Sequence, residues 1–320
     1  MRSPSIDLLH ALSTRGPQPR AALAAACRLR KADLERCLAR LGGNGFVATD
    51  GELVRLAAPF DFLDAGRIAA GLGARASRVR VDVLDACPST STALMRDSAP
   101  PLVRLLLTEE QVQGRGRRGR RWLSCVGAGI AMSLRCAFSR SVRELAALPL
   151  AAGVAATRAL RSLGASDAAL KWPNDLLVRG AKLGGILTET RTQDGRVLGV
   201  VGIGLNCRST PALEGRLGHR VAALEEFVAP CPSRNEVAAR VAAELLDAMD
   251  SFDAAGLAGF KDEWEALHAH AGQRLRVRLA DGRVLAGIAD GLAEDGGLRL
   301  RTRSGVRAVR TGRVVSARAV

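Results

Sequence analysis

The sequence of 320 residues lacks long hydrophobic runs, and its start lacks the basic and then apolar stretch of a leader. Because a membrane helix needs about 18 to 20 consecutive apolar residues, neither a membrane span nor a signal peptide is expected. The seven cysteines are odd in number, widely scattered and never spaced as C-x-x-C. This distribution excludes a disulfide framework and a cysteine zinc site, and it favours a reduced, cytoplasmic compartment.

Other familiar signals are missing too. Neither a G-x-S-x-G elbow nor a P-loop occurs, which excludes the common hydrolase and P-loop kinase classes. The histidines have no acids or cysteines at ligand spacing, so they predict packing or surface positions and no metal site: His10, His219, His268 and His270. Lysine is scarce among the 47 basic residues and occurs only at Lys31, Lys171, Lys182 and Lys261. Arginine-rich codon usage therefore explains the net charge of +15 more simply than nucleic-acid binding does.

The first 65 residues have the pattern of three short helices and a hairpin. Apolar residues recur at helical spacing from Ile6 and again from Leu34, and Asp50-Gly51 suits a two-residue hairpin turn. This predicts a winged helix-turn-helix DNA-binding domain at residues 1–65. The basic residues expected to contact DNA are Arg28, Arg30, Lys31, Arg36 and Arg40. Because the region carries nine basic and seven acidic residues, a winged helix kept only as a scaffold is the alternative.

Strand and helix patterns mix irregularly from residue 66 to residue 270, which indicates an α+β domain with a largely antiparallel sheet. Buried strands are expected at 102–108, 176–178, 186–189 and 197–205, and helices at 150–163, 237–245 and 260–268. From 271 to 320 apolar residues and arginines alternate at the period of a strand, which predicts a small β-barrel. After residue 272 eleven arginines stand against four acids. Solvated strand faces explain this, with direct nucleic-acid binding as the alternative.

The segment from Gln111 to Trp122 is the strongest chemical signal. From Gly114 onward it packs five arginines and three glycines into nine residues. Guanidinium groups bind phosphate or carboxylate through paired hydrogen bonds, and glycines let the backbone approach a ligand closely. The segment therefore predicts an anion-binding loop, with a plain basic surface loop as the alternative. No amphipathic helix follows, so the formal G-x-G-x-x-G pattern does not predict dinucleotide binding.

Half of the lysines frame a second segment. Lys171 begins K-W-P-N-D, and Lys182, eleven residues later, begins K-L-G-G-I. Lysine is a compact charge suited to a phosphate or to a carboxylate under attack, and Asn174 and Asp175 suit a nucleotide with its metal. Gly184 would let a ligand lie against a strand. The Pro-Asn-Asp sequence also forms a turn, whatever else it does.

Two weaker signals complete the set. Ser89-Thr90-Ser91 offers hydroxyls to a polar ligand, or else caps a helix. Gly202 and Gly204 interrupt an apolar strand that ends at Asn206. Since glycine lowers the tendency to form a strand, these positions indicate the close approach of another group.

Taken in order between Ser89 and Asn206, these five motifs resemble the bacterial biotin protein ligase family. With the predicted N-terminal domain, the whole chain resembles the bifunctional members that also repress the biotin operon. The resemblance implies a catalytic domain at 66–270, related to class II aminoacyl-tRNA synthetases and built on a mixed sheet. It also implies an SH3-like barrel at 271–320.

Matched residue by residue, the resemblance also implies roles. Lys182 and Arg117 would be catalytic and would hold the carboxylate of biotin against the α-phosphate of ATP. Biotin and its adenylate would be bound by Ser89, Thr90, Ser91, Gln111, Gly114, Arg115, Gly116, Arg117, Lys182, Gly184 and Gly204. ATP with Mg²⁺ would be bound by Arg120, Trp122, Lys171, Asn174, Asp175 and Asn206, without a metal held tightly by the protein. Ser91 departs from the asparagine that is frequent at its position.

The implied activity is ATP-dependent formation of biotinyl-5′-AMP and transfer of biotin to a lysine of the biotin carboxyl carrier protein of acetyl-CoA carboxylase. The arginine loop would order over the adenylate, and the loaded protein would dimerise and repress biotin genes at an operator. One alternative is a regulator that senses a small anion without catalysis, which Lys171, Lys182 and Trp122 argue against. Another is a lipoate protein ligase, which the arginine loop argues against.

Overall fold

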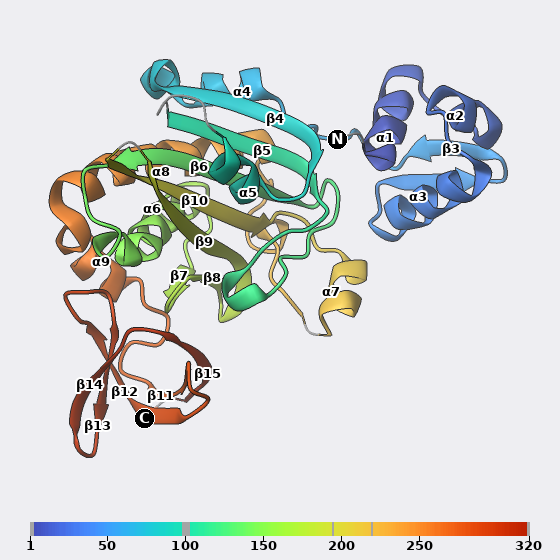
Figure 1. Ribbon diagram of the computed structural model, residues 1–320. Coiled ribbons are helices and arrows are strands. Elements are labelled where there is room, and N and C mark those ends of the chain that lie inside the picture. Colours follow the sequence, from blue (N-terminus) through green and yellow to red (C-terminus); the bar gives the residue numbers. More distant parts are fainter. Residues whose placement is uncertain (1–2, 98–102, 194, 219, 319–320) are drawn as a thin grey trace.

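The computed structural model describes residues 3–97, 103–193, 195–218 and 220–318, and it has three parts along the chain (Figure 1). A small N-terminal part leads into a large central part built on one sheet, and a second sheet forms the C-terminal end. The sequence predictions for Leu102 and His219 lie outside the described residues. Within the described ranges, no helix has the length and apolarity needed to cross a bilayer.

The N-terminal part consists of three helices and a three-stranded antiparallel sheet. Its elements are α1 (Pro4–Arg15), β1 (Gln18–Pro19), α2 (Arg20–Ala26), α3 (Lys31–Gly43), β2 (Val47–Asp50) and β3 (Leu53–Leu56). Gly51, with a φ of 56°, closes the β2–β3 turn, as Asp-Gly turns require. Leu9 of α1 and Leu34 of α3 are fully buried in a second core, which residues of the central part such as Val126 and Leu213 complete. The three predicted helices and the hairpin are thus present.

A seven-stranded mixed sheet forms the centre of the molecule. In spatial order it contains β4 (Val79–Cys87), β5 (Val103–Gln111), β6 (Gly129–Phe138), β10 (Arg196–Asn206), β9 (Ala181–Gln193), β8 (Asp175–Val178) and β7 (Ala168–Lys171). Strands β4 and β5 run parallel, and the other neighbouring pairs run antiparallel. The predicted α+β class with a largely antiparallel sheet is confirmed.

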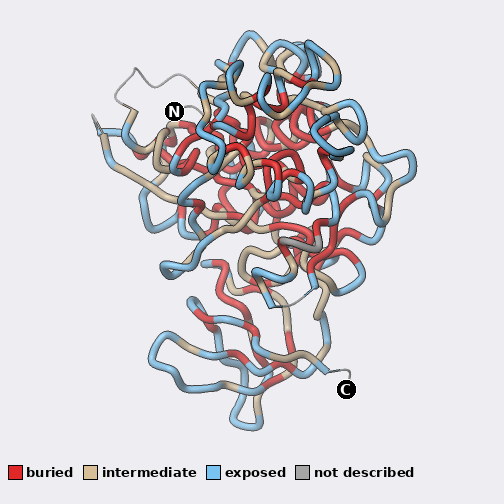
Figure 2. The backbone as a smooth tube through the Cα atoms, turned by 90° about the vertical axis from the view of Figure 1, so that its right-hand side faces the viewer, coloured by how far each residue is buried: buried red, intermediate tan, exposed pale blue. Residues whose placement is uncertain are grey.

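Two long helices cover one face of this sheet, and a short helix lies on the other (Figure 1). Helix α6 (Leu148–Ser162) is rich in alanine, and its Gly153 lies so close to Leu170 that a β-carbon would come within 3.0 Å. Figure 2 shows the resulting buried layer between the helices and the sheet. The other helices are α8 (Arg234–Ala255), α5 (Thr90–Arg96), α4 (Ala65–Gly71), α7 (Pro211–Leu217) and α9 (Lys261–Ala266). Short 3₁₀ turns lie at Gly73–Arg78, Arg117–Gly119, Glu144–Ala147, Leu224–Glu226 and Gly256–Gly259.

The C-terminal part is a five-stranded antiparallel sheet. Its strands are β11 (Arg274–Leu279), β12 (Val284–Leu292), β13 (Leu298–Thr302), β14 (Gly305–Val309) and β15 (Gly312–Arg318), in the order β14-β13-β12-β11-β15. Leu275 and Val277 point into its core and are fully buried, as the alternation predicts. The indole N–H of Trp172, itself 2% exposed, donates to the carbonyl of Gly296 at 3.1 Å. This contact adds to the apolar core that the sheet shares with the central part.

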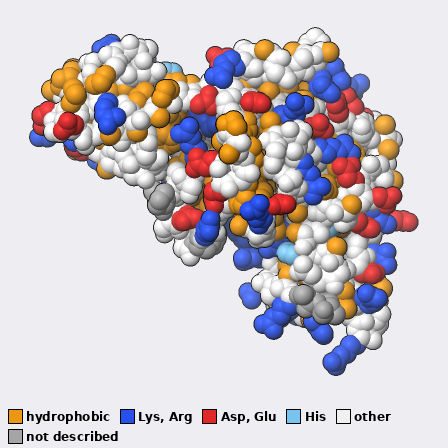
Figure 3. Space-filling model, turned by 180° about the vertical axis from the view of Figure 1, so that it is seen from behind, with side chains coloured by type: hydrophobic (Ala, Val, Ile, Leu, Met, Phe, Trp, Pro, Cys, Tyr) orange, Lys and Arg blue, Asp and Glu red, His pale blue; other side chains and the backbone are white. Residues whose placement is uncertain are grey.

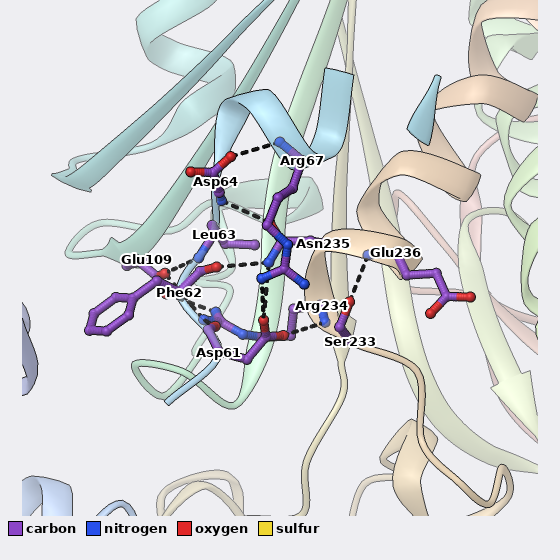
Figure 4. Close-up of polar contacts among 10 residues, drawn as sticks. All are labelled: Asp61, Phe62, Leu63, Asp64, Arg67, Glu109, Ser233, Arg234, Asn235 and Glu236. Carbon is purple, nitrogen blue, oxygen red and sulfur yellow. Dashed lines mark hydrogen bonds and ion pairs between the residues drawn. The ribbon is translucent and has the colours of Figure 1, made fainter. Parts of the chain in front are cut away.

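A buried polar network holds the link between the N-terminal and central parts (Figure 4). Arg234, at the start of α8, forms an ion pair with Glu109 of β5 at 2.8 Å, and both side chains are under 5% exposed. Glu109 also accepts the backbone N–H of Leu63 at 2.7 Å. The carboxylate of Asp61 accepts the N–H of Arg234 at 2.6 Å and the side-chain amide of Asn235 at 3.1 Å. The linker is therefore held on the central part through both its backbone and its side chains.

Candidate active site

A cavity of about 420 Å³ opens where β5 ends. Its wall combines the start of α5, the loop that follows Gln111, the turn before β8 and the middle of β9 and β10. The C-terminal part closes one side with residues 312–314 of β15. Segments that are far apart in the sequence therefore build one site.

Hydroxyl groups and an amide form the end of the cavity beside α5. Ser89 caps α5, since its side chain accepts the N–H of Thr92 at 3.4 Å. The hydroxyls of Thr90 and Ser91 lie 2.7 and 2.9 Å from that of Ser133 on β6. The side chain of Gln111 accepts the backbone N–H of Thr90 at 2.9 Å. The capping and ligand interpretations of this segment are thus compatible, because Ser89 caps while its neighbours face the cavity.

The arginine loop folds back on itself as a narrow hairpin. The N–H of Gly116 donates to Arg120 at 2.7 Å, and the N–H of Trp122 donates to Gly114 at 2.9 Å. At the tip, Arg118 and Gly119 have φ values of 57° and 71°, in the left-handed region that glycine adopts at little cost. The loop therefore presents its guanidinium groups on a short, closed scaffold rather than on an open chain.

The indole of Trp122 lies flat against the floor of the cavity. A β-carbon on Gly204 of β10 would come within 2.3 Å of the indole ring, and one on Gly185 of β9 would come within 3.7 Å. Because glycine has no side chain, both positions leave room for the indole to lie against the strands. The group whose close approach the sequence indicated at Gly204 is therefore Trp122. The Nζ atom of Lys182 lies 6.0 Å from the ring centroid, within cation–π range.

The K-W-P-N-D turn and the arginine loop meet across the cavity. Lys182 forms an ion pair with Asp175, and the guanidinium of Arg117 donates to the amide oxygen of Asn174 at 3.4 Å. Asn174 is itself fixed, because its amide donates to the carbonyl of Ile186 at 2.6 Å. Both predicted catalytic cations are thus held in the wall by residues of the same turn.

The wall is strongly cationic. Its described residues include eight cationic side chains and one carboxylate, that of Asp175: the cations are Arg115, Arg117, Arg118, Arg120, Arg121, Lys171, Lys182 and Arg313. Burial lowers the pKa of Arg117 and the pKa of Lys171, because both charges are partly withdrawn from water. The cations of the wall repel one another, and a polyanion that entered the cavity would relieve this repulsion. The site therefore suits the binding of phosphate and carboxylate groups.

Most of the predicted ligand residues meet in this wall. They are Ser89, Thr90, Ser91, Gln111, Arg115, Gly116, Arg117, Arg120, Trp122, Lys171, Asn174, Asp175, Lys182 and Gly204. Three others lie behind it. A β-carbon on Gly114 would meet the carbonyl of Trp122, and one on Gly184 would meet that of Gly204, so both glycines allow backbone packing. Asn206 is buried and donates to the carbonyl of Ala222 at 3.1 Å.

Comparison with known proteins identifies the chemistry. A model described as the biotin/lipoate A/B protein ligase family matches residues 84–206, and one described as the biotin protein ligase C-terminal domain matches residues 270–316. The bifunctional ligase/repressor BirA of Salmonella typhimurium is 30% identical over 244 residues, which cover 76% of this chain and 74% of that protein. The chain belongs to the biotin protein ligase family.

Other relatives agree. The biotin–[acetyl-CoA-carboxylase] ligase of Mycobacterium tuberculosis is 32% identical and is matched over 67% of this chain and 79% of that protein. The match to BirA of Escherichia coli, at 32% identity, spans 60% of that protein. The biotin protein ligase of Aquifex aeolicus, solved in complex with biotin and ATP, shares the fold with a TM-score of 0.63 and 26% identity, covering 75% of this chain and 99% of that one. The enzyme class is therefore that of the biotin ligases.

Sequence reasoning missed the part of the cavity wall that comes from β15. Gly312, Arg313 and Val314 line the cavity, and Arg118 of the loop donates to the hydroxyl of Thr311 at 3.0 Å. No local signal marks these residues, because they reach the cavity only through the packing of the C-terminal sheet. The apolar wall residues Met132, Ile186 and Ile203 also gave no signal beyond that of buried strand positions.

The five N-terminal cations predicted to contact DNA are all exposed, but some of them pair with acids of the chain. Arg30 and Arg36 both pair with Asp33 of α3 while staying exposed, and Arg28 and Lys31 are exposed without such a pair. Arg40 was also predicted to contact DNA, but its guanidinium pairs with Glu110 of β5 at 2.6 Å. Three of the five predicted DNA contacts are therefore already engaged with acids of the chain. Among the described residues no cluster of three metal-ligating side chains occurs.

Proposed function

We propose that this chain activates biotin with ATP and transfers it to a lysine of the biotin carboxyl carrier protein of acetyl-CoA carboxylase. The observation that supports this most is the cavity wall, where eight cations and one carboxylate surround an indole platform. A carboxylate and a triphosphate repel each other, so their reaction needs cations placed between them. The match of the C-terminal model, described for biotin protein ligases alone, favours biotin over lipoate.

In the first step a carboxylate oxygen of biotin attacks the α-phosphorus, and the bond to the β-phosphate oxygen breaks as pyrophosphate leaves. Lys182 and Arg117 enter the wall from opposite segments, and each is held by a partner on the K-W-P-N-D turn. They are therefore positioned to neutralise the two reacting anions. Trp122 offers its indole to the adenine, and Lys171 offers a desolvated ammonium to phosphate.

In the second step the amine of the carrier lysine attacks the acyl carbon, and AMP leaves as the lysine nitrogen loses a proton. The mixed anhydride must be kept from water until then. The arginine loop, which closes on itself and contacts Thr311 of the C-terminal part, supplies such a cover.

Magnesium would enter with the nucleotide. Asp175 is the carboxylate in the wall and Asn174 offers an amide oxygen next to it, a donor set that suits Mg²⁺ when phosphate oxygens complete its coordination. Bound Mg²⁺ would neutralise phosphate charge. The chain would not hold the ion without the nucleotide.

The test is ATP–pyrophosphate exchange with biotin, with lipoate and with neither. We expect exchange that depends on biotin and falls at least about 100-fold in Lys182→Ala, because one preorganised charge at a developing anion contributes on this scale. Lys261→Ala, which changes a lysine outside the cavity wall, is the matched control and should behave as wild type. Exchange that required lipoate, or a fully active Lys182→Ala, would reject the assignment.

We also infer a second function for the N-terminal part, repression of biotin genes by an adenylate-loaded dimer at an operator. Its three helices and hairpin are the elements of a winged helix-turn-helix, and Lys31 at the start of α3 and Arg28 in the turn before it are exposed. Several relatives named bifunctional ligase/repressor support this. A gel shift with the chain's own biotin-gene promoter, run with and without biotin and ATP, tests this repression. If no complex formed in either case, repression would be rejected and only the ligase activity would remain proposed.

A further inference from the structure

Exposed arginines line one face of the C-terminal sheet. In β11 the buried residues Leu275 and Val277 alternate with exposed arginines, so those arginines share the outer side. Strand β15 pairs with β11 and adds two more. The resulting arginine face consists of Arg274, Arg276, Arg278, Arg313 and Arg318. In Figure 3 basic side chains predominate over the lower part of the molecule, which this domain forms.

The register of the two strands places like charges opposite each other. Arg274 lies opposite Arg318, and Arg278 lies opposite Arg313. Directly opposed like charges destabilise a pair of strands, because their side chains extend from the same side at short distance. An anionic partner on this face would turn that repulsion into attraction.

No acid of the described chain neutralises this face. Three of the four acids of the C-terminal sheet pair with other arginines: Asp281 with Arg283, Asp290 with Arg299 and Asp295 with Arg310. Among the described residues, no ion pair or side-chain hydrogen bond involves the five arginines of the face. The face therefore keeps its full positive charge.

The arginine face is continuous with the cavity. Arg313 belongs to both, since it lines the cavity wall and lies opposite Arg278 in the sheet. The N-terminal part, with the basic residues proposed for DNA, lies at the other end of the molecule (Figure 1). A protein bound on the arginine face could thus insert a side chain into the cavity. A DNA duplex carries no such side chain.

We propose that the arginine face docks the protein substrate, through acidic residues around its acceptor lysine. This inference rests on the proposed function. Complementary charge mainly accelerates encounter and orients the partner, so the effect belongs to the transfer step and not to adenylation.

The test compares two double variants with the same change in charge. Arg274→Glu with Arg276→Glu reverses the arginine face without touching Arg313, and Arg301→Glu with Arg307→Glu reverses two exposed arginines on β13 and β14, at the opposite edge of the sheet. The acceptors are the biotin carboxyl carrier domain of acetyl-CoA carboxylase from the same genome and, as a small uncharged nucleophile, hydroxylamine.

We expect the first variant to lower kcat/KM for the carrier domain about tenfold or more, mainly through KM, and to weaken its dependence on salt. Biotin-dependent pyrophosphate exchange and hydroxamate formation should stay within about twofold of wild type. The control variant should match wild type in all three assays, and thermal melting should show that both variants are folded.

Each other outcome would overturn the proposal. Unchanged carrier kinetics with normal exchange would remove the docking role, and equal losses in the two variants would assign the effect to total charge. If random-sequence duplex DNA lost affinity in the first variant alone while carrier kinetics held, the face would belong to nucleic acid. Absence of biotin-dependent exchange in the wild type would instead reject the proposed function itself.

Discussion

The N-terminal part meets the central part through a small apolar cluster and a buried network of charges, whereas the C-terminal sheet shares the main apolar core of the central part and lines the cavity. At the N-terminal junction Arg234 and Glu109 are paired and buried, and Arg40 is paired with Glu110. At the other end, no described acid pairs with Arg313 or with the other arginines of the arginine face. Both parts carry an excess of basic residues, so composition alone does not separate a structural arginine from one available to a ligand. Pairing with acids of the same chain separates the two kinds of arginine.

The largest expected effect breaks the N-terminal junction. Arg234→Ala leaves the carboxylate of Glu109 buried without its partner, which costs about 3–5 kcal/mol of unfolding free energy. Arg67→Ala removes an exposed, 3.4 Å pair with Asp61 and should cost less than about 1 kcal/mol. Urea unfolding of both variants makes the comparison. A loss below about 1 kcal/mol in Arg234→Ala would show that the network does not hold this junction.

The boundary with the C-terminal sheet should instead respond to pH. Burial against Trp264 lowers the pKa of His268 from 6.5 to about 4. The unfolded chain therefore takes up a proton before the folded chain does. The contribution of neutral His268 to the unfolding free energy is therefore fully present above pH 6.5. It is lost as the pH falls toward 4, by up to about 3 kcal/mol.

His268→Phe keeps a ring beside Trp264 and removes this titration, so its unfolding free energy should fall less steeply over that range. The same comparison in His10→Phe, where the histidine stacks on Phe62 in the N-terminal part, is the control. Equal pH slopes in wild type and His268→Phe would show that folding does not lower the pKa of this histidine.

Much of this arrangement could be predicted from sequence where the signal is local. The leucine spacing of α3, the apolar run of β10 and the arginine loop each carry their own pattern, and the structure has the first two as elements and the third in the cavity wall. Strand β4, Val79–Cys87, was missed although Val79, Val81 and Val83 alternate with charged residues at the period of a strand. It gains its place by pairing with β5, which is not visible in its own sequence.

The glycines of the cavity also show that a local sequence pattern does not reveal which strands or groups come together. The sequence indicated close approach at Gly204 and Gly184 alike, since glycine weakens a strand and often marks a point where another group comes close to the backbone. The structure places the indole of Trp122 over Gly204, but it places the backbone of the next strand against Gly184. Which group approaches a glycine depends on strand register, and register is set by the whole sheet. For the same reason Arg313 could not be assigned to the cavity in advance.

Neutralising one arginine in the C-terminal sheet and one in the N-terminal part compares their roles in nucleotide binding directly. Arg313→Ala should raise the KM for ATP in pyrophosphate exchange about tenfold, because it removes one of the cations from the cavity wall. Arg28→Ala, an equal change on the exposed N-terminal part, should leave exchange unchanged. If both variants behaved as wild type, the C-terminal sheet would close the cavity without contributing charge to nucleotide binding.

The smallest effect concerns the contact between α3 and the central sheet. Glu110 accepts hydrogen bonds from Arg40 and from the hydroxyl of Ser3, each at 2.6 Å, and it follows directly on Glu109 in β5. Glu110→Gln removes the charge but keeps the shape, and because Arg40 is partly exposed the loss of stability should stay under about 1 kcal/mol. The freed guanidinium should then bind phosphate. The affinity for random-sequence duplex DNA should rise a few-fold, and its salt dependence should steepen by about one counterion. Adding Arg40→Gln should cancel this gain, whereas a gain that persisted would mean that another cation is responsible.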